Sequence, residues 1–325
     1  MEQPLFDAIK AGKIADVKQL VGRDPSLLQA RDASGASAIL VAEGAAPASA
    51  SAAIIEDSDP RRRLALIASR FFGLQPETAV AVTGTNGKTS VASFVRQLWE
   101  GQGYRAASLG TVGVVSPSGT AVLKHTTPDP IELHRILAAL ARDGITHLAL
   151  EASSHGLQQR RADGVALAAG AFTNISRDHL DYHASFEDYF AQKLRLFTEL
   201  LPRGAGAVVD VDSEAGTRVA GVAEARGLKL YSVGRDGKTL RLASAELDGF
   251  GQLLVIEHAG QRFHVRLPLV GAFQASNALV AAGLAMATGA DAATVLPMLE
   301  SLKGARGRLD LAGTCLLYTS DAADE

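Results

Sequence analysis

Apolar and polar positions alternate along most of the chain in blocks that predict strands and helices by turns. Short apolar runs rich in Val, Ala and Leu predict strands, and stretches whose apolar residues recur every three or four positions predict amphipathic helices. The expected strands span residues 78–84, 105–115, 146–153, 165–176, 205–212 and 228–234, and the expected helices between them span residues 88–103, 130–144, 185–201 and 214–227. This alternation is typical of an α/β fold with a mostly parallel sheet and crossover helices.

Two further patterns complete the main body. Residues 240–268 hold three alternating runs joined by short glycine-containing turns, which predict a small antiparallel sheet at the edge of the parallel one. Helices are expected from about residue 272 to 288 and from about 292 to 302. Ahead of the first strand, Asp59 followed by Pro60 predicts the start of a helix, and Gly73 predicts its end.

Residues 1–42 differ from the rest of the chain. The segments 4–8 and 38–42 share a small and apolar pattern 34 positions apart, and residues 35–42 resemble the turn and first-helix start of an ankyrin repeat. The resemblance implies a short helical, ankyrin-like extension that offers a surface to a protein partner. A plain helical extension docked on the main body is the alternative. Residues 44–53 are rich in Ala and Ser and predict a linker.

Composition limits the function classes. The chain has 325 residues, 47% hydrophobic and 21% charged, with a formal net charge of -3, which is ordinary for a globular protein and disfavours disorder or nucleic-acid binding. No apolar run approaches the roughly 20 residues that cross a bilayer, and charged residues near the start interrupt any signal peptide. The single cysteine, Cys315, cannot form an intrachain disulfide, so we expect a cytoplasmic protein without membrane insertion.

The strongest chemical signal is the segment GTNGKTS, which lies between an expected strand and an expected helix. Glycines let the backbone N–H groups converge, the helix N-terminus adds positive potential, and the lysine brings a charge to terminal phosphates. The threonine that follows can ligate magnesium. Two residues separate the glycines where the usual phosphate loop has four, so a shorter variant is implied. We expect the loop to bind a nucleotide through Gly84, Thr85, Asn86, Gly87, Lys88, Thr89 and Ser90.

The run TGTNGKTS resembles the nucleotide loop of the Mur ligases, ATP-dependent enzymes that extend the peptide of the bacterial cell-wall precursor, and of their relatives the folylpolyglutamate synthetases. Four more segments are similar to the MurE-type branch: HTTPDP (125–130), LEASSHGLQQRR (150–161), NISRDHLDYH (174–183) and FEDYFAQKLRLF (186–197). The resemblance covers roughly residues 54–312. It implies an ATP- and Mg²⁺-dependent ligase that joins meso-diaminopimelate or L-lysine to UDP-N-acetylmuramoyl-L-alanyl-D-glutamate (UDP-MurNAc-L-Ala-D-Glu).

Glu151 ends an apolar strand, so its carboxylate is expected at the carboxyl edge of the sheet, where ligands of open parallel sheets bind. The resemblance implies that Glu151 and Thr89 bind magnesium; a surface glutamate at a strand end is the alternative. His179 matches a second metal-binding and catalytic position of the family. A purely structural polar turn is the alternative. With His183 four residues further on, zinc is a weaker one, because no cysteine is near and imidazoles alone do not select zinc.

Lys193 lies fourteen residues beyond His179 on an expected amphipathic helix. Judged from the residues alone, Lys193 is an exposed helix lysine. The resemblance instead implies a carbamylated lysine (N6-carboxylysine), whose two anionic oxygens bind magnesium where an ammonium, which has no acceptor lone pair, cannot. Together with Lys88 and His179, Lys193 completes the catalytic set that the resemblance implies.

The substrate side is also assigned by the resemblance. The muramoyl dipeptide is expected at Thr126, Thr127, Ser153, Gln159 and Arg161. Judged from the residue alone, Ser153 is better interpreted as an ordinary turn or helix-cap residue. The two threonines precede Pro128, which favours an extended backbone with free hydroxyl and N–H groups, and the planar donors of Arg161 suit a carboxylate. Asn277 matches a family residue near the nucleotide, although an inward asparagine on an alanine-rich helix is equally consistent with packing.

The implied reaction transfers the terminal phosphoryl group of ATP to the D-glutamyl side-chain carboxylate, and an amine then attacks the acyl phosphate to form the amide. Two other functions stay open. One is a folylpolyglutamate synthetase-like ligase, against which HTTPDP and SSHGLQQRR argue. The other is a non-catalytic, ankyrin-bearing interaction protein that binds a nucleotide.

The chain departs from the family pattern at both ends. We expect an ankyrin-like extension at 1–42, a linker with a remnant of the uridine-binding domain at 43–75, the central ATP-binding domain at 76–303, and a stub of the C-terminal domain with a foreign-looking tail at 304–325. In the family, the third domain closes over ATP and holds the incoming amino acid. We therefore expect a truncated or chimeric chain with weak nucleotide binding and little ligase activity.

Overall fold

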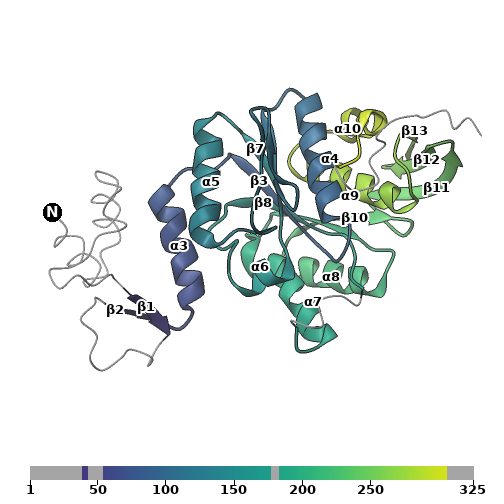
Figure 1. Cartoon of the computed structure of the whole chain (residues 1–325). Coiled ribbons are helices and arrows are strands. Elements are labelled where there is room, and N and C mark those ends of the chain that lie inside the picture. The colour runs from purple at the N-terminus through teal and green to yellow at the C-terminus, as the bar shows by residue number, and fades with distance from the viewer. Residues whose placement is uncertain (1–38, 43–53, 177–182, 306–325) are drawn as a thin grey trace, which may run out of the picture.

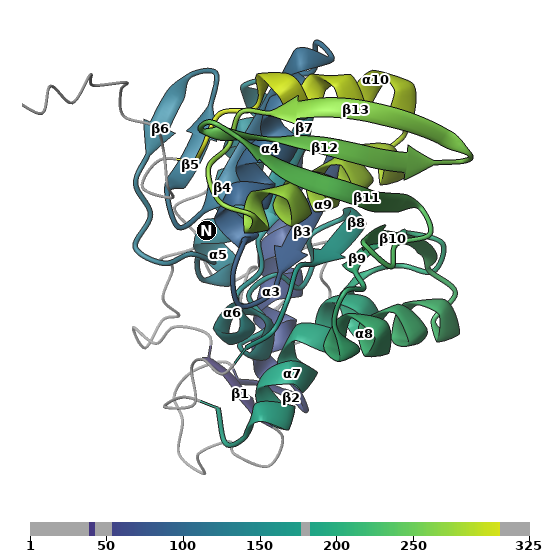
Figure 2. The same cartoon turned by 90° about the vertical axis from the view of Figure 1, so that its right-hand side faces the viewer.

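The computed structural model describes residues 39–42, 54–176 and 183–305. Its centre is an 11-stranded sheet in the order β13-β12-β11-β10-β9-β8-β3-β7-β4-β5-β6 (Figures 1 and 2). The strands are β3 Thr78–Thr83, β4 Ala106–Gly110, β5 Gly113–Ser116, β6 Gly119–Ala121, β7 His147–Glu151, β8 Leu167–Phe172, β9 Gly206–Asp210, β10 Lys229–Gly234, β11 Leu240–Asp248, β12 Gly251–His258 and β13 Gln261–Leu267. Neighbours from β11 to β4 pair in parallel, and β11 to β13 pair antiparallel. The predicted mostly parallel sheet with an antiparallel edge is confirmed.

Helices cover both faces of this sheet. They are α3 Pro60–Phe72, α4 Lys88–Gly101, α5 Pro130–Arg142, α6 Ser154–Gln158, α7 Phe186–Arg195, α8 Glu214–Ala225, α9 Phe273–Ala287 and α10 Ala292–Met298. A π-helical turn, Leu196–Leu200, continues α7, and a 3₁₀ turn, Leu299–Ser301, continues α10. In Figure 1, α5 lies on one face with α3 outside it, and α4 and α9 lie on the other.

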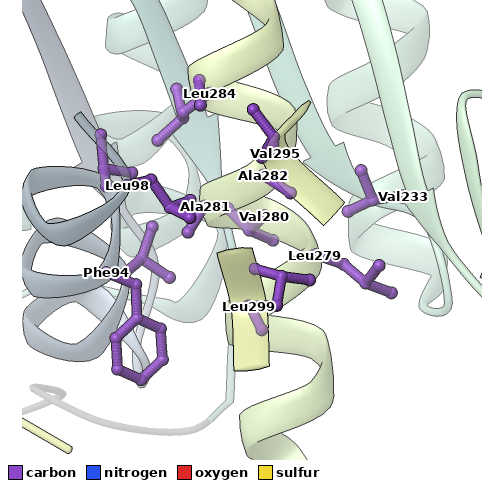
Figure 3. Close-up of a cluster of buried hydrophobic side chains, with 14 of the residues drawn as sticks. Phe94, Leu98, Val233, Leu279, Val280, Ala281, Ala282, Leu284, Val295 and Leu299 are labelled. Carbon is purple, nitrogen blue, oxygen red and sulfur yellow. The ribbon is translucent and has the colours of Figure 1, made fainter. Parts of the chain in front are cut away.

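The core has two layers because alternate residues of each strand point to opposite faces. Val80 and Val82 of β3 pack with α4 and α9, whereas Ala79 and Ala81 pack with α5 on the opposite face. The α4 and α9 layer is shown in Figure 3, where side chains from α4, α9, α10 and β10 meet. Helix α9 is rich in alanine and buried along most of its length, so it lies close against the sheet.

The expected strand over residues 105–115 is instead two strands. The chain reverses at Thr111–Val112, and Gly110 pairs with Gly113 in an antiparallel β4–β5 hairpin, to which β6 adds a short third strand. The apolar run is continuous through the turn, so hydrophobic pattern alone does not reveal the reversal. The short helix α6, directly after β7, was also not predicted.

The helix predicted after Asp59 is confirmed. Asp59 caps α3 by accepting from the N–H of Arg62, Pro60 occupies the first turn, and Gly73 ends the helix in the left-handed conformation (φ 72°). Just before it, strand β2 (Ile54–Asp57) pairs in parallel with β1 (Ile39–Ala42).

Strand β1 corrects the ankyrin interpretation, because residues 39–42 do not begin a helix. The described residues do not include the rest of the proposed extension, the linker at 44–53, or residues 306–325 with Cys315. Within the described ranges, no helix combines the length and apolar character needed to span a membrane.

Candidate functional site

The segment between β3 and α4 is a tight loop that only glycine permits at two positions. Gly84 and Gly87 have φ of 146° and 88°. A Cβ on Gly84 would lie 2.0 Å from Oγ1 of Thr173, and a Cβ on Gly87 would lie 2.3 Å from Oδ1 of Asn277. Asn277 is therefore next to the loop, and it also packs, because its amide donates to Gln274 (3.0 Å).

The end of β8 fixes the loop backbone. The carbonyl of Asn86 accepts from Oγ1 of Thr173 (2.6 Å), and the N–H of Asn86 donates to Oδ1 of Asn174 (3.0 Å). The N–H of Thr85 donates to the carbonyl of Asn174 (2.8 Å), and its hydroxyl lies 3.0 Å from that of Tyr189 on α7. These neutral hydrogen bonds and the close packing hold part of the loop, and Ser90 is buried at the start of α4.

Two lysines converge on one carbonyl of the loop. Nζ of Lys88 donates to the carbonyls of Gly84 (2.9 Å) and Thr85 (2.8 Å), and Nζ of Lys193 donates to that of Gly84 (2.8 Å). Lys193 is 1% exposed, and its ammonium lies 4.3 Å from the centre of the Tyr189 ring. The interpretation of Lys193 as an exposed helix lysine is therefore wrong.

Glu151 lies at the carboxyl end of β7 and is 2% exposed, so the surface alternative is wrong for this residue as well. Its carboxylate accepts from the backbone N–H (2.8 Å) and the hydroxyl (3.1 Å) of Thr111. Across the described ranges, no lysine or arginine forms an ion pair with it. Glu151 and Thr89 line the same cavity, of about 500 Å³, which runs along α4.

This arrangement fits a hard divalent cation. A buried carboxylate and a threonine hydroxyl in one cavity offer the oxygen ligands that magnesium prefers, and magnesium keeps several waters. Lys193 as an ammonium is a donor only, so it fits a metal only in its carbamate form. His179 lies outside the described residues.

Zinc gains no support from the described residues, among which no cluster of three or more His, Cys, Asp or Glu could hold a metal. His183 is buried and has other contacts. Its Nε2 lies 3.0 Å from the hydroxyl of Ser154, and its Nδ1 lies 3.4 Å from a carboxylate oxygen of Asp188.

The five residues predicted to bind the dipeptide gather beside Glu151. The hydroxyl of Thr127 donates to the backbone carbonyl of Glu151 (2.9 Å) and lies 3.1 Å from the hydroxyl of Ser153. Ser153 caps α6. Arg161 donates to the carbonyl of Thr127 (2.7 Å) and to the side-chain carbonyl of Gln159 (2.7 Å). A further contact, between the hydroxyls of Thr126 and Thr111 (3.2 Å), connects this dipeptide patch to the turn above Glu151.

An ionic network that the sequence did not reveal lies next to this patch and contacts α6. Arg195, 7% exposed, pairs with Asp163 (3.2 Å) and Glu199 (3.0 Å), and it donates to the carbonyl of Leu157 on α6. Arg160, between Gln159 and Arg161, has a φ of 61°; it pairs with Asp59 (2.7 Å) at the start of α3 and with Glu199. The network joins α3, α6 and the end of α7.

Charge and burial compete within the network. Burial raises the pKa of Asp163 above its ordinary value, although the Arg195 guanidinium acts in the opposite direction. Burial also acts to raise the pKa of Glu199, but hydrogen bonds and charge from Arg195 and Arg160 outweigh it, so that pKa is lowered. Desolvation therefore sets the direction of the pKa shift for Asp163, the more buried carboxyl, whereas the arginines set it for Glu199.

The chain is similar to known proteins in both sequence and fold. A family model described as "Mur ligase middle domain" matches residues 82–285. The chain is 52% identical over 282 residues to "UDP-N-acetylmuramoyl-L-alanyl-D-glutamate--2,6-diaminopimelate ligase" of Bradyrhizobium diazoefficiens, an alignment that covers 86% of this chain and 58% of that protein. The chain therefore spans less than two thirds of the length of this relative.

Two solved structures extend the comparison. A structure titled as a ligase of the same name has a TM-score of 0.72 and 29% identity, with 79% of this chain and 53% of the other covered. "Mycobacterium tuberculosis Folylpolyglutamate synthase complexed with ADP" has a TM-score of 0.61 and 18% identity, with 76% and 62% covered. The second likeness concerns the fold alone.

Proposed function

We propose a function on one established premise, namely that the chain belongs to the Mur ligase family. On that premise the proposed activity is ATP-dependent amide ligation in peptidoglycan precursor synthesis, in the cytoplasm. The acceptor is UDP-MurNAc-L-Ala-D-Glu and the added amino acid is meso-diaminopimelate rather than L-lysine, since the relative at 52% identity is named for 2,6-diaminopimelate. Because the chain spans 58% of that relative, its activity and substrates are our inference.

One observation carries the proposal. Thr89 of the phosphate loop and the buried carboxylate of Glu151 line one cavity. The dipeptide patch contacts Glu151 directly through Thr127, and Thr126 contacts Thr111, which donates to the Glu151 carboxylate. A nucleotide phosphate, a divalent cation and a carboxylate acceptor would then meet within one site. Phosphoryl transfer to a carboxylate requires this juxtaposition, because positioning and charge neutralisation supply most of its acceleration.

The chain's own residues would act as follows. The backbone N–H groups of residues 84–90 and the ammonium of Lys88 would hold the phosphates, and Asn277 would lie against the nucleotide next to Gly87. Thr89 and Glu151 would ligate magnesium, with His179 and the carbamate form of Lys193 as the further ligands that we propose. Bound magnesium would neutralise charge on the transferring phosphoryl group.

On the acceptor side, Arg161 supplies planar donors that can pair with both oxygens of a carboxylate. Its guanidinium is already held by Thr127 and Gln159, so little freedom is lost on binding. Thr126 and Ser153 would present hydroxyls to the peptide. The amine of the third amino acid would attack the resulting acyl phosphate, and the amide would form as the C–O bond to phosphate breaks and inorganic phosphate leaves.

Ligand binding tests the proposal against its alternatives. The wild-type chain is titrated calorimetrically with UDP-MurNAc-L-Ala-D-Glu, with a reduced folate and with ADP in the presence of Mg²⁺. We expect binding of the muramoyl dipeptide and of ADP but not of the folate. Lys88→Ala should weaken ADP binding by more than about tenfold, whereas Lys229→Ala, at an exposed lysine of β10, should not.

Each alternative has its own outcome. Preferential binding of the folate would replace the proposal with a folylpolyglutamate synthetase-like ligase. Equal ADP affinity in wild type and Lys88→Ala would favour the non-catalytic interaction protein.

A further inference from the structure

The β4–β5 turn lies directly on the carboxylate of Glu151. The N–H of Thr111 donates to Oε1 (2.8 Å) and its hydroxyl donates to Oε2 (3.1 Å), so one residue engages both oxygens. Hydrogen bonds to an ionised carboxylate are about twice as strong as neutral ones. Glu151 is 2% exposed, and these two donors fix the plane of its carboxylate inside the cavity.

The neighbouring glycine permits this close approach. A Cβ on Gly110 would lie 2.0 Å from Oε1 of Glu151 and 2.4 Å from its carboxyl carbon. Any other residue at Gly110 would force the turn and the carboxylate apart, by moving one or the other. The contact between turn and carboxylate is thus built into the backbone as well as into the threonine side chain.

The same hydroxyl also reaches the substrate side. Oγ1 of Thr111 lies 3.2 Å from Oγ1 of Thr126, and Thr111 is otherwise exposed at the rim of the site. A hydroxyl has one proton to donate and two lone pairs that accept. With its proton on Glu151, Thr111 can accept from Thr126, so the orientation of each hydroxyl depends on the other.

We propose that Thr111 is a positioning residue that aligns the Glu151 carboxylate with the bound cation and couples the cation site to the dipeptide site through Thr126. The inference rests on the proposed function, in which Glu151 binds magnesium and Thr126 contacts the muramoyl dipeptide. Magnesium and dipeptide then strengthen each other's binding, and this coupling is reciprocal because both are equilibrium quantities.

The test uses the full chain and variants at three sites, Thr111, Thr126 and a control position. Thr111→Val keeps the shape and the backbone N–H but removes the hydroxyl, and Thr111→Ser restores it. Thr120→Val is the matched control, because Thr120 is an exposed threonine that lines the same cavity on β6. Calorimetry measures the affinity for UDP-MurNAc-L-Ala-D-Glu in the presence of AMP-PNP, with and without Mg²⁺, and thermal unfolding confirms that each variant folds.

We expect Mg²⁺ to strengthen dipeptide binding in wild type, and Thr111→Val to reduce this enhancement about tenfold. Thr111→Ser and Thr120→Val should retain the wild-type enhancement. In a double-mutant cycle, Thr111→Val and Thr126→Val should be non-additive, because both remove the same hydroxyl pair. A purely structural turn residue would alter the unfolding temperature without altering the Mg²⁺ enhancement.

Two results would count against the inference in different ways. An unchanged Mg²⁺ enhancement in Thr111→Val, with a normal wild type, would overturn the role of Thr111 alone. Failure of wild type itself to bind the muramoyl dipeptide would overturn the proposed function and this inference with it.

Discussion

The two halves of the candidate site are held in place by different forces. The phosphate loop is shaped by close contacts and by hydrogen bonds to its backbone: Gly84 and Gly87 have no room for a Cβ, Thr173 and Asn174 hold the backbone, and the ammonium groups of Lys88 and Lys193 donate to its carbonyls. The dipeptide patch is instead supported by the ion pairs of Arg160 and Arg195. Backbone sterics and hydrogen bonds to the backbone hold the proposed nucleotide half, whereas ion pairs between side chains support the proposed acceptor half.

The difference predicts how each half responds to change. The shape of the loop should change when a side chain is enlarged, because the close-packed backbone has no space into which it can move. The ionic half should be sensitive to removal of one charge, since the remaining buried charge is left uncompensated. The following changes test this contrast, from the largest expected effect to the smallest.

Gly84→Ala should have the largest effect. The added Cβ would meet Oγ1 of Thr173 at 2.0 Å and the carbonyl of Asn174 at 3.0 Å. Since the loop must shift, we expect ADP affinity to fall by at least about 1,000-fold, or roughly 4 kcal/mol, measured by calorimetry. Gly221→Ala in α8, where nothing lies within 4 Å of the added Cβ, should leave ADP binding unchanged. Normal ADP binding by Gly84→Ala would show that the loop is not sterically fixed.

Arg195→Met should destabilise the fold rather than the nucleotide site. It leaves the carboxyl of Asp163, 7% exposed, without its buried partner. Breaking a buried pair costs about 3–5 kcal/mol, to be measured as the free energy of unfolding in urea. Arg135→Met removes an exposed pair with Glu132 and should cost less than about 1 kcal/mol. Equal costs in the two variants would contradict the ionic support of the acceptor half.

Arg160 allows strain and charge to be separated. Both Arg160→Ala and Arg160→Gly remove the pairs with Asp59 and Glu199, but only glycine adopts the φ of 61° without a steric cost. We expect the free energy of unfolding of Arg160→Gly to exceed that of Arg160→Ala by about 1 kcal/mol. Both variants should weaken dipeptide binding, because Gln159 and Arg161 flank this residue. Unchanged dipeptide affinity in both would remove Arg160 from the support of the patch.

The smallest effect concerns pH. His134 on α5 is 1% exposed, its Nε2 donates to the carbonyl of Asp163 (3.0 Å), and burial lowers its pKa below the ordinary 6.5. The unfolded chain therefore takes up this proton first, so stability falls as the pH drops below 6.5 toward the lower folded pKa. Every tenfold difference in proton affinity between the two states corresponds to about 1.4 kcal/mol. His134→Gln should flatten the stability profile between pH 7 and pH 5, and an unchanged slope would contradict this assignment.

Sequence reasoning predicted the mostly parallel sheet with its antiparallel edge, and the glycine turn between a strand and a helix, because these depend on local pattern. It failed where distant segments meet. The periodicity of α7 places Lys193 on the same face as Tyr189, Phe190 and Phe197, a signal that could have shown its burial. No comparable pattern marks Thr111 or Arg160, whose partners are brought close only by the packed sheet and helices.

One measurement tests the central claim, that Thr89 and Glu151 share a cation site at the phosphate loop. ADP affinity is measured by calorimetry with Mg²⁺ and with EDTA, for wild type and for Glu151→Gln. We predict that Mg²⁺ strengthens ADP binding in wild type and that Glu151→Gln loses most of this gain while its affinity in EDTA stays the same. Retention of the full Mg²⁺ gain by Glu151→Gln would contradict the claim.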